Sequence, residues 1–323
     1  MYHADNHRPA PTRTTRLARA ILVVASVWTT VVTAGQSFAQ STESWMTALP
    51  DTRLLSQMSI PGTHDTCALL GGDLFECQTM PLMDQLNAGI RFIDIRCRHI
   101  KDAFAIHHDR IYQGIDFGEG VRDVCLRFLD THPGECIIMS VKEEYQPANN
   151  TRSFEATFDW YLEGNRNRWY LGNTVPALGD VRGQIVLFRR FSARAPVLGI
   201  DASRWPDDAT FEINNSAHLK VQDEYVVPTV FAIPKKWDKI KALLDEAGSA
   251  TDDRWYVNFS SGTSGSGGAY PYTVAKGSPG ITGENDHLHG YLSTPPAGKV
   301  GTILMDFPEY PDNLLIAQLI GLN

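Results

Sequence analysis

The sequence has no surplus of positive charge, and it has no long apolar run after its first forty residues. Its 323 residues carry a formal net charge of −8 at pH 7. Nucleic acids, and membranes that hold proteins mainly by charge, both select basic surfaces, so the composition argues against either attachment. The hydrophobic share of 43% is that of an ordinary globular chain. The length suits one large α/β domain or two average ones.

The chain also lacks a C-x-x-C pair, an internal repeat and a coiled-coil heptad. The first absence argues against a zinc ribbon or a thioredoxin-like redox centre. Five cysteines are present, at Cys67, Cys77, Cys97, Cys125 and Cys136. An odd number leaves at least one thiol unpaired within the chain, and Cys67 with Cys77 would close a short loop. We expect the cysteines to be structural, although spacing alone leaves their connectivity open.

The first 39 residues have the pattern of an export signal. A cluster of arginines precedes a mostly apolar stretch from 20 to 34, and Ser37–Ala39 offers small residues to a signal peptidase. The stretch is shorter than the roughly 20 apolar residues of a spanning helix. We therefore expect residues 1–39 to be a removed signal peptide and residues 40–323 to be a single domain, secreted or periplasmic. An N-terminal anchor that is never cleaved is the alternative.

Short runs rich in isoleucine, valine and phenylalanine alternate with stretches of helical periodicity. Strands are predicted over 57–60, 90–95, 103–106, 136–141, 184–188, 219–221, 255–259 and 300–305. Helices are predicted over 120–131, 151–162, 235–247 and 312–320, the last with Asp312 as its cap. This alternation favours an α/β fold whose parallel sheet closes into a β/α barrel. An open doubly wound sheet would want a glycine-rich phosphate turn after its first strand, and none follows residue 60.

Charged side chains and histidines stand where most of the predicted strands end. They are His64 and Asp65, Arg96 and Arg98, His107 and His108, Lys142, Arg189 and Arg190, Asp223, and Asp306. In a β/α barrel the carboxyl ends of the strands form the active face, so these side chains are expected to surround one pocket. Any one of them alone is better explained as a solvated loop residue. Seven strands that end alike indicate a shared site.

This set of side chains suits the cleavage of a phosphodiester. The reaction needs a base for the nucleophile, an acid for the leaving oxygen and positive charge for the non-bridging oxygens. Histidine serves as base or acid near neutrality, an arginine matches phosphate with paired donors, and a carboxylate beside a histidine fixes its tautomer. Metal ligation is the rival use of these residues, but the cationic Arg96 and Lys142 would repel a divalent ion.

Six motifs of the chain resemble, in order, those of the bacterial phosphatidylinositol-specific phospholipases C. They are Ser59–Thr66, Ala88–Arg98, Ile106–His108, Ile137–Tyr145, Arg182–Leu187 and Val221–Tyr225. The resemblance runs from about Met58 to Asp306 and so covers essentially all of the expected mature chain. It implies an irregular, incompletely closed TIM-type β/α barrel. It also implies an enzyme that cleaves phosphatidylinositol, or a glycosylated form of it, to diacylglycerol and inositol 1,2-cyclic phosphate.

The resemblance further implies a role for each site residue. His64 would be the general base for the inositol 2-hydroxyl, and His108 the general acid for the diacylglycerol oxygen. Arg96 would hold the phosphate, while Asp306 and Asp65 would orient or charge-balance the catalytic groups. The inositol hydroxyls would be bound by Lys142, Arg190, Asp223 and Tyr225, with Tyr225 stacked on the ring.

The same comparison leads us to expect no metal and no other cofactor. Calcium-dependent relatives resemble this pattern but have Asn after the first catalytic histidine and carboxylates at two further positions. Those three positions hold Asp65, Arg96 and Lys142 here, and calcium wants several oxygen ligands. One alternative, a glycerophosphodiester phosphodiesterase-like hydrolase, resembles a metal enzyme and meets the same objection. A catalytically inactive inositol-lipid-binding module should lack at least one catalytic residue, and none is missing.

Two loops depart from the family pattern. The bacterial relatives carry tryptophans on two mobile loops that resemble membrane anchors. Here the segment 70–83 has Phe75, and the segment 260–268 leads to Tyr270 and Tyr272. Tyrosine also suits an interface. We therefore expect only transient contact with the membrane surface. We also expect the protein to be a monomer.

Overall fold

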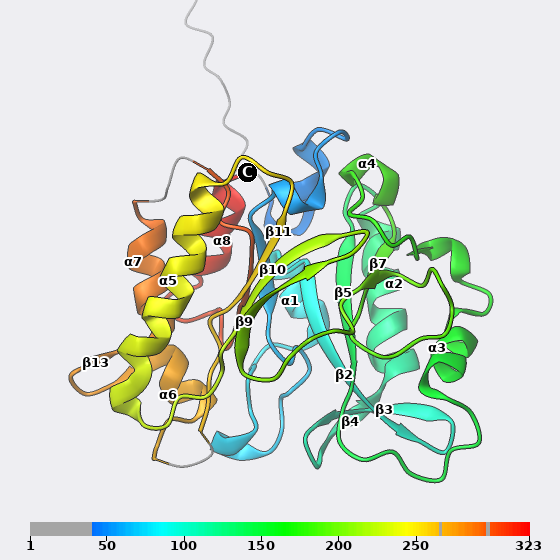
Figure 1. Ribbon diagram of the computed structural model, residues 1–323, viewed down its shortest axis with the longest axis horizontal. Coiled ribbons are helices and arrows are strands. Elements are labelled where there is room, and N and C mark those ends of the chain that lie inside the picture. Colours follow the sequence, from blue (N-terminus) through cyan, green and yellow to red (C-terminus); the bar gives the residue numbers. More distant parts are fainter. Residues whose placement is uncertain (1–40, 265–266, 295–297) are drawn as a thin grey trace, which may run out of the picture. The chain divides into compact units, whose positions relative to one another are not determined.

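The computed structural model describes residues 41–264, 267–294 and 298–323 (Figure 1). The described residues from Ser41 on form one compact unit. The expected signal peptide, residues 1–39, lies outside the described part of the chain. Of the helices in that part, none combines the length and the apolar character needed to span a bilayer.

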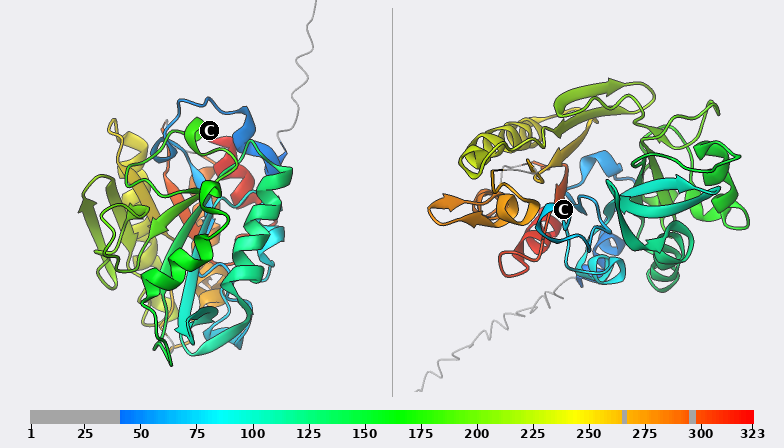
Figure 2. Two further views of the ribbon diagram at one scale, coloured as in Figure 1. Left: turned by 90° about the vertical axis from the view of Figure 1, so that its right-hand side faces the viewer. Right: turned by 90° about the horizontal axis from the view of Figure 1, so that it is seen from below.

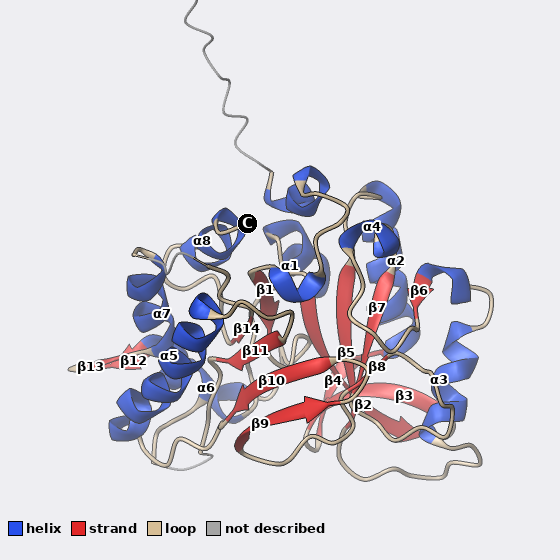
Figure 3. Cartoon of the chain, turned by 45° about the horizontal axis from the view of Figure 1, so that its top comes forward, coloured by secondary structure: helices blue, strands red, loops and turns tan. Residues whose placement is uncertain are grey.

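The centre of the fold is a curled, mostly parallel sheet (Figure 3). Along its main path lie β6 (Trp169–Tyr170), β7 (Ile185–Arg189), β5 (Ile137–Glu143), β2 (Phe92–Ile100), β1 (Ile60–Thr63), β14 (Thr302–Met305), β11 (Trp255–Phe259), β10 (His218–Asp223) and β9 (Ala209–Asn214). Only the β9–β10 pair is antiparallel among the pairs of this path. The path is not closed by hydrogen bonds between β6 and β9 within the described residues. The incompletely closed β/α barrel is therefore confirmed.

A hairpin outside the barrel corrects one of the predicted strands. β3 (Ala103–His108) and β4 (Ile111–Asp116) form an antiparallel hairpin whose first strand pairs with β2. The segment 103–106 was expected to be a barrel strand, because its alternation of apolar residues is the same in a barrel strand and in a hairpin strand. β2 is nine residues long, and its last four residues, from Cys97 on, pair with β3. His108 thus reaches the site from a hairpin.

The first barrel strand lies later in the chain than the sequence indicated. The segment 57–60 was predicted as a strand, but Leu55–Gln57 is a 3-10 helix and β1 begins at Ile60. The Pro-Gly pair at the start of the strand hid it, because both residues are usually strand breakers. Gly62 is required there, since a Cβ would lie 2.9 Å from the Phe92 carbonyl oxygen on β2. β8 (Ile200–Asp201) pairs with β7, and β12 (Gly277–Ser278) with β13 (Ile281–Thr282) forms a separate ribbon.

Helices cover the outside of the curled sheet (Figure 2). They are α1 (Leu82–Ala88), α2 (Asp123–Thr131), α3 (Phe154–Leu162), α4 (Leu178–Val181), α5 (Ile233–Ser249), α6 (Pro271–Lys276), α7 (Glu284–Leu292) and α8 (Leu314–Gly321). The four predicted helices correspond to α2, α3, α5 and α8. The longest, α5, buries Ile240, Leu244 and Ala247 at the spacing of one helical face. The expected cap of the last helix is wrong, because Asn313, not Asp312, occupies the N-cap position.

The five cysteines are free and buried. The loop closure considered for Cys67 and Cys77 is therefore not formed. Burial of a thiol in an apolar interior is common, because cysteine packs there as a small hydrophobic residue. Four of the five behave in this way in the main core, whereas Cys77 lies beside the polar side chains described next.

Candidate active site

The carboxyl ends of the barrel strands open into one pocket of about 300 Å³. Eight of the nine residues predicted for the site line it: His64, Arg96, His108, Lys142, Arg190, Asp223, Tyr225 and Asp306. The ninth, Asp65, is fully buried and contacts two of these residues from below. The parallel barrel explains the gathering, because it brings the ends of its strands to one edge.

The ends of β1 and β14 are fixed next to each other. The backbone N–H of His64 donates to the carbonyl of Met305 at 3.0 Å, which continues the parallel pairing of the two strands. The side-chain amide of Gln78 donates to the carbonyls of both His64 and Met305, at 2.8 and 2.9 Å. Asp306 follows Met305 directly. The imidazole and the carboxylate are thus presented from neighbouring strand ends.

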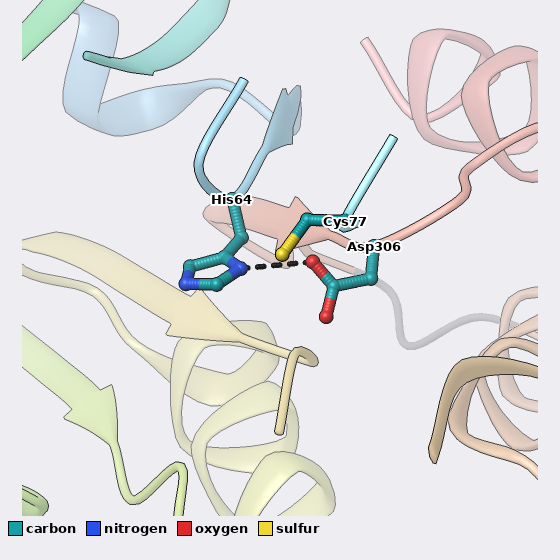
Figure 4. A group of neighbouring side chains, drawn as sticks. All are labelled: His64, Cys77 and Asp306. Atoms are coloured by element: carbon teal, nitrogen blue, oxygen red, sulfur yellow. Dashed lines mark hydrogen bonds and ion pairs between the residues drawn. The ribbon is translucent and has the colours of Figure 1, made fainter. Parts of the chain in front are cut away.

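His64 lies between a carboxylate and a guanidinium. Figure 4 shows the carboxylate, that of Asp306, facing the ring. Its Nδ1 is 2.8 Å from Oδ1 of Asp306, and its Nε2 is 2.7 Å from Nη2 of Arg96. A guanidinium can only donate, so Nε2 must be the accepting nitrogen. The ring proton therefore sits on Nδ1 and is donated to Asp306. This tautomer leaves the lone pair of Nε2 facing the pocket side of the ring, as a general base requires.

Arg96 joins His64 to two buried carboxylates. Its guanidinium is 3.2 Å from Asp94 and 3.5 Å from Asp65. Burial raises the pKa of the Asp65 carboxyl, and the charge of Arg96 only partly opposes that effect. Burial would also raise the pKa of Asp94, but Arg96 and Arg190 hold it below its ordinary value. At least one of the two carboxylates therefore stays ionised and keeps the guanidinium in place.

The second histidine approaches from the β3–β4 hairpin. Nδ1 of His108 is 2.7 Å from the carbonyl oxygen of Phe75 and 3.5 Å from Oδ2 of Asp65. A carbonyl only accepts, so Nδ1 carries a proton. The rings of His64 and His108 stand perpendicular, with their centroids 6.4 Å apart. Both rings line the same pocket.

The far wall of the pocket carries two more cations. Lys142, at the end of β5, is 3.1 Å from Glu144, and burial together with Arg96 lowers the pKa of this lysine. Arg190 follows β7 and lies 3.6 Å from Asp94 and 3.8 Å from Asp223. Burial lowers the pKa of Arg190, although both carboxylates oppose this. Cationic donors and anionic acceptors thus surround the same cavity.

Trp205 and Asp207 complete the pocket, and the sequence had not singled them out. Trp205 stacks under Arg190 at 3.8 Å and donates its indole N–H to Asp223 at 2.9 Å. The hydroxyl of Tyr225 donates to Asp207 at 2.9 Å, and burial together with this carboxylate raises the pKa of Tyr225 to about 12. Trp205 and Asp207 lie in a loop before β9 without any periodic signal. Only their position in space connects them with the site.

Three other strand-end residues stay outside the pocket. Arg98 lies over the ring of Tyr145, because β2 runs past the barrel edge into the hairpin. Arg189 donates to the carbonyls of Leu198 and Phe191 and is buried in that loop. His107 is buried and alternates with His108 to the other face of β3. These three residues also follow or end predicted strands, as the pocket residues do. Only the path of the folded chain distinguishes them from the residues that line the pocket.

One group of side chains in the described residues could hold a metal ion. It consists of His64, Cys77 and Asp306 (Figure 4), whose ligand atoms all lie within 4.8 Å of one another. Arg96 and Lys142 lie at the opposite side of the imidazole or farther along the pocket, and both are cations. These two cations disfavour a divalent ion next to them, although carboxylates also line the pocket.

A β/α barrel that joins two histidines, a guanidinium and buried carboxylates in one pocket defines an acid–base enzyme for phosphate esters. Residues 52–191 match the model of the family described as phosphatidylinositol-specific phospholipase C, X domain. The chain is 33% identical to a 1-phosphatidylinositol phosphodiesterase of Staphylococcus aureus, over 94% of this chain and 96% of the relative. For a protein of the same name from Listeria monocytogenes the identity is 31%, over 83% and 82%.

Solved structures give the same assignment. A phosphatidylinositol-specific phospholipase C of Staphylococcus aureus superimposes with a TM-score of 0.77 at 31% identity, covering 88% of this chain and 98% of that one. The enzyme of Listeria monocytogenes gives a TM-score of 0.68 at 30% identity, over 88% and 99%. The chain belongs to the bacterial phosphatidylinositol-specific phospholipase C family.

Proposed function

We propose that this chain is a phosphatidylinositol-specific phospholipase C. It cleaves the glycerol–phosphate bond of phosphatidylinositol and releases diacylglycerol and inositol 1,2-cyclic phosphate. The observation that carries the proposal is the pairing of two histidines around one guanidinium. Arg96 donates to His64, and it shares the carboxylate of Asp65 with His108. A base, an acid and a phosphate-binding cation are thus held in one pocket.

His64 starts the reaction as the general base. Its Nε2 takes the proton of the inositol 2-hydroxyl, whose oxygen then attacks phosphorus. The imidazolium that forms is stabilised by Asp306, which is 2.8 Å from Nδ1. Arg96 occupies the lone pair of Nε2 in the free enzyme. When substrate binds, the guanidinium therefore exchanges this contact for a non-bridging phosphate oxygen, which its paired donors match.

His108 completes the reaction as the general acid. Its Nδ1 already holds a proton that is donated to the carbonyl of Phe75, so the proton for the leaving group comes from Nε2. The acting form is thus the imidazolium, and the carboxylate of Asp65 stabilises it. As the bond between phosphorus and the glycerol oxygen breaks, diacylglycerol leaves with this proton.

The other end of the pocket recognises the inositol ring. Lys142 and Arg190 donate to ring hydroxyls, and Asp223 accepts from them. Tyr225 lies at the pocket wall and offers an aromatic face for stacking on the ring. Trp205 keeps Arg190 and Asp223 in place through its stacking and its indole hydrogen bond.

Catalysis needs no metal ion, because Arg96 supplies the charge that a divalent cation would supply elsewhere. The test is phosphorus NMR of the purified enzyme with phosphatidylinositol micelles, with and without excess EDTA. Equal formation of the cyclic inositol phosphate in both samples supports the proposal. Activity only without chelator indicates a metal enzyme. No turnover in either sample indicates a binding module.

The diacylglycerol part of the bound substrate extends from the pocket into a shallow apolar groove. Leu74, Phe75 and Val226 line this groove next to His108 and Tyr225. Leu74 and Val226 are 42% and 49% exposed. Apolar side chains beside the scissile bond suit a monomer that touches the membrane surface briefly during each turnover. Export of the mature chain without residues 1–39 is part of the proposal, and the intact mass of the secreted protein tests it.

A further inference from the structure

Three side chains at the edge of the active site form a mixed cluster of nitrogen, sulfur and oxygen. Nδ1 of His64, Sγ of Cys77 and a carboxylate oxygen of Asp306 lie within 4.8 Å of one another (Figure 4). His64 and Asp306 line the pocket and come from the ends of β1 and β14. Cys77 comes from the loop before α1 and lies behind them. The proposed reaction uses the histidine and the aspartate but not the thiol.

Two atoms of the cluster have unused capacity for ligands. Oδ2 of Asp306 is buried and has no hydrogen-bond partner among the described residues. The sulfur of Cys77 is fully buried and makes only long contacts, both of 3.8 Å, with the carbonyl of Phe75 and with Nδ1 of His108. A buried carboxylate oxygen without a partner is unusual and calls for an explanation. A ligand shared by both residues provides one.

We propose that His64, Cys77 and Asp306 bind a thiophilic divalent cation, with Zn²⁺ as the natural choice, and that the bound ion inhibits the enzyme. Zinc takes imidazole nitrogen, thiolate sulfur and carboxylate oxygen in a tetrahedron, with water in an open fourth position. Its bond lengths place neighbouring ligand atoms roughly 3.4–3.8 Å apart. The cluster therefore fits after shifts of about 1 Å. Calcium and magnesium want oxygen ligands only and do not fit this set.

The site lies on the side of His64 away from the cation that disfavours metals in the pocket. Arg96 contacts Nε2, whereas the cluster uses Nδ1 of the same ring. The thiolate and the carboxylate together offset the two charges of the ion. Burial, together with Asp306 and Asp65, raises the pKa of the Cys77 thiol, so metal and proton compete for the sulfur. Binding therefore tightens as pH rises.

Inhibition follows from the tautomer of the base and rests on the proposed role of His64. In the free enzyme the proton is on Nδ1 and the lone pair on Nε2. Coordination uses the lone pair of Nδ1, so that ring proton moves to Nε2, and the thiol releases its proton to water. One proton leaves for each ion bound. With Nε2 protonated, His64 cannot accept the proton of the inositol hydroxyl, and it also loses its bond with Arg96.

Two measurements on the full enzyme test the site. The first follows the ultraviolet thiolate-to-metal absorption of Cd²⁺ added to chelator-treated protein without substrate. We expect the band in the wild type and in Cys125→Ser, whose buried thiol lies in α2 away from the cluster, but not in Cys77→Ser. A band that persists in Cys77→Ser overturns the site. Because no turnover is involved, this outcome is independent of the proposed function.

The second measurement titrates activity with Zn²⁺. We expect inhibition of the wild type and of Cys125→Ser that EDTA reverses, no effect of Ca²⁺ or Mg²⁺, and at least a tenfold higher inhibitory concentration for Cys77→Ser. Equal sensitivity of Cys77→Ser and the wild type contradicts the proposal, because zinc then acts elsewhere or on the lipid. A Cd²⁺ band without zinc inhibition keeps the site but refutes the general-base role of His64.

Discussion

Replacing Asp306 with asparagine isolates the charge of the carboxylate that faces the base. The side chain keeps its shape, and Oδ1 is the atom at 2.8 Å from His64 Nδ1, so the packing of the strand ends changes little. In the free enzyme this carboxylate faces a neutral ring, but after proton transfer it faces an imidazolium. The lost interaction is therefore one between unit charges that exists mainly in the transition state.

Its size follows from Coulomb's law. Two unit charges at about 4 Å interact by about 4 kcal/mol at an effective dielectric constant of 20. Since 1.36 kcal/mol corresponds to a factor of ten in rate, kcat should fall by about 10³-fold while KM changes little. The assay is the initial rate with a short-chain soluble phosphatidylinositol. Asp245→Asn, an exposed carboxylate of α5, is the matched control, and thermal unfolding checks the fold. A loss of less than tenfold in a folded Asp306→Asn would refute the charge argument.

The remaining predictions concern the acid, the phosphate-binding group and a buried carboxyl. His108→Ala should lower kcat by about 10²–10⁴-fold in the same assay, because proton donation to the leaving oxygen is lost; a wild-type rate would end its assignment. Arg96→Lys should also lower kcat strongly, because one ammonium cannot reproduce the planar pair of donors, and unchanged kinetics would place Arg96 away from the phosphate. Burial raises the pKa of Glu284 well above its ordinary value, with Lys236 opposing. When the pKa of a carboxyl is higher in the folded than in the unfolded protein, its full contribution to the stability of the fold is present below the unfolded pKa and is lost as pH rises. The free energy of unfolding in urea should therefore fall as pH rises from about 4.5 to 7. Glu284→Gln should lack this fall. Parallel pH profiles of the two proteins would contradict that reading.

Much of the site could be predicted because a parallel barrel converts sequence order into spatial convergence. The polar residues in or just after the carboxyl-terminal parts of β1, β2, β5, β7, β10 and β14 reach one pocket because these strands lead to one edge of the barrel. Sequence could not separate Arg96 from Arg98, since both obey the same alternation and only the point where β2 leaves the barrel divides them. It also could not find Trp205, which lies in an irregular loop and joins the site only through the fold.

The strand at 103–106 shows the same limit for the fold. Its pattern of buried and exposed residues is that of any half-buried strand, and it says nothing about the direction of pairing. The neighbouring strand decides the direction of pairing. β2 is long enough to pair with a hairpin beyond the barrel, and the first strand of that hairpin runs antiparallel to β2. The position of β1 was predicted wrongly because its proline and glycine are weak strand formers. Tertiary contacts override this local preference and place both residues in the strand.

The hairpin places the two proposed proton transfers on different parts of the sheet. His64 and Arg96 lie on strands of the barrel, whereas His108 lies on the β3–β4 ribbon, whose strand pairing with the barrel runs through β2 alone among the described residues. A small hinge motion of that ribbon would withdraw the proton donor and leave nucleophile activation intact. Substrates whose leaving group needs no protonation, such as nitrophenyl esters of inositol phosphate, would then still react. The ratio of turnover on such an ester to turnover on the natural lipid thus reports where the ribbon stands.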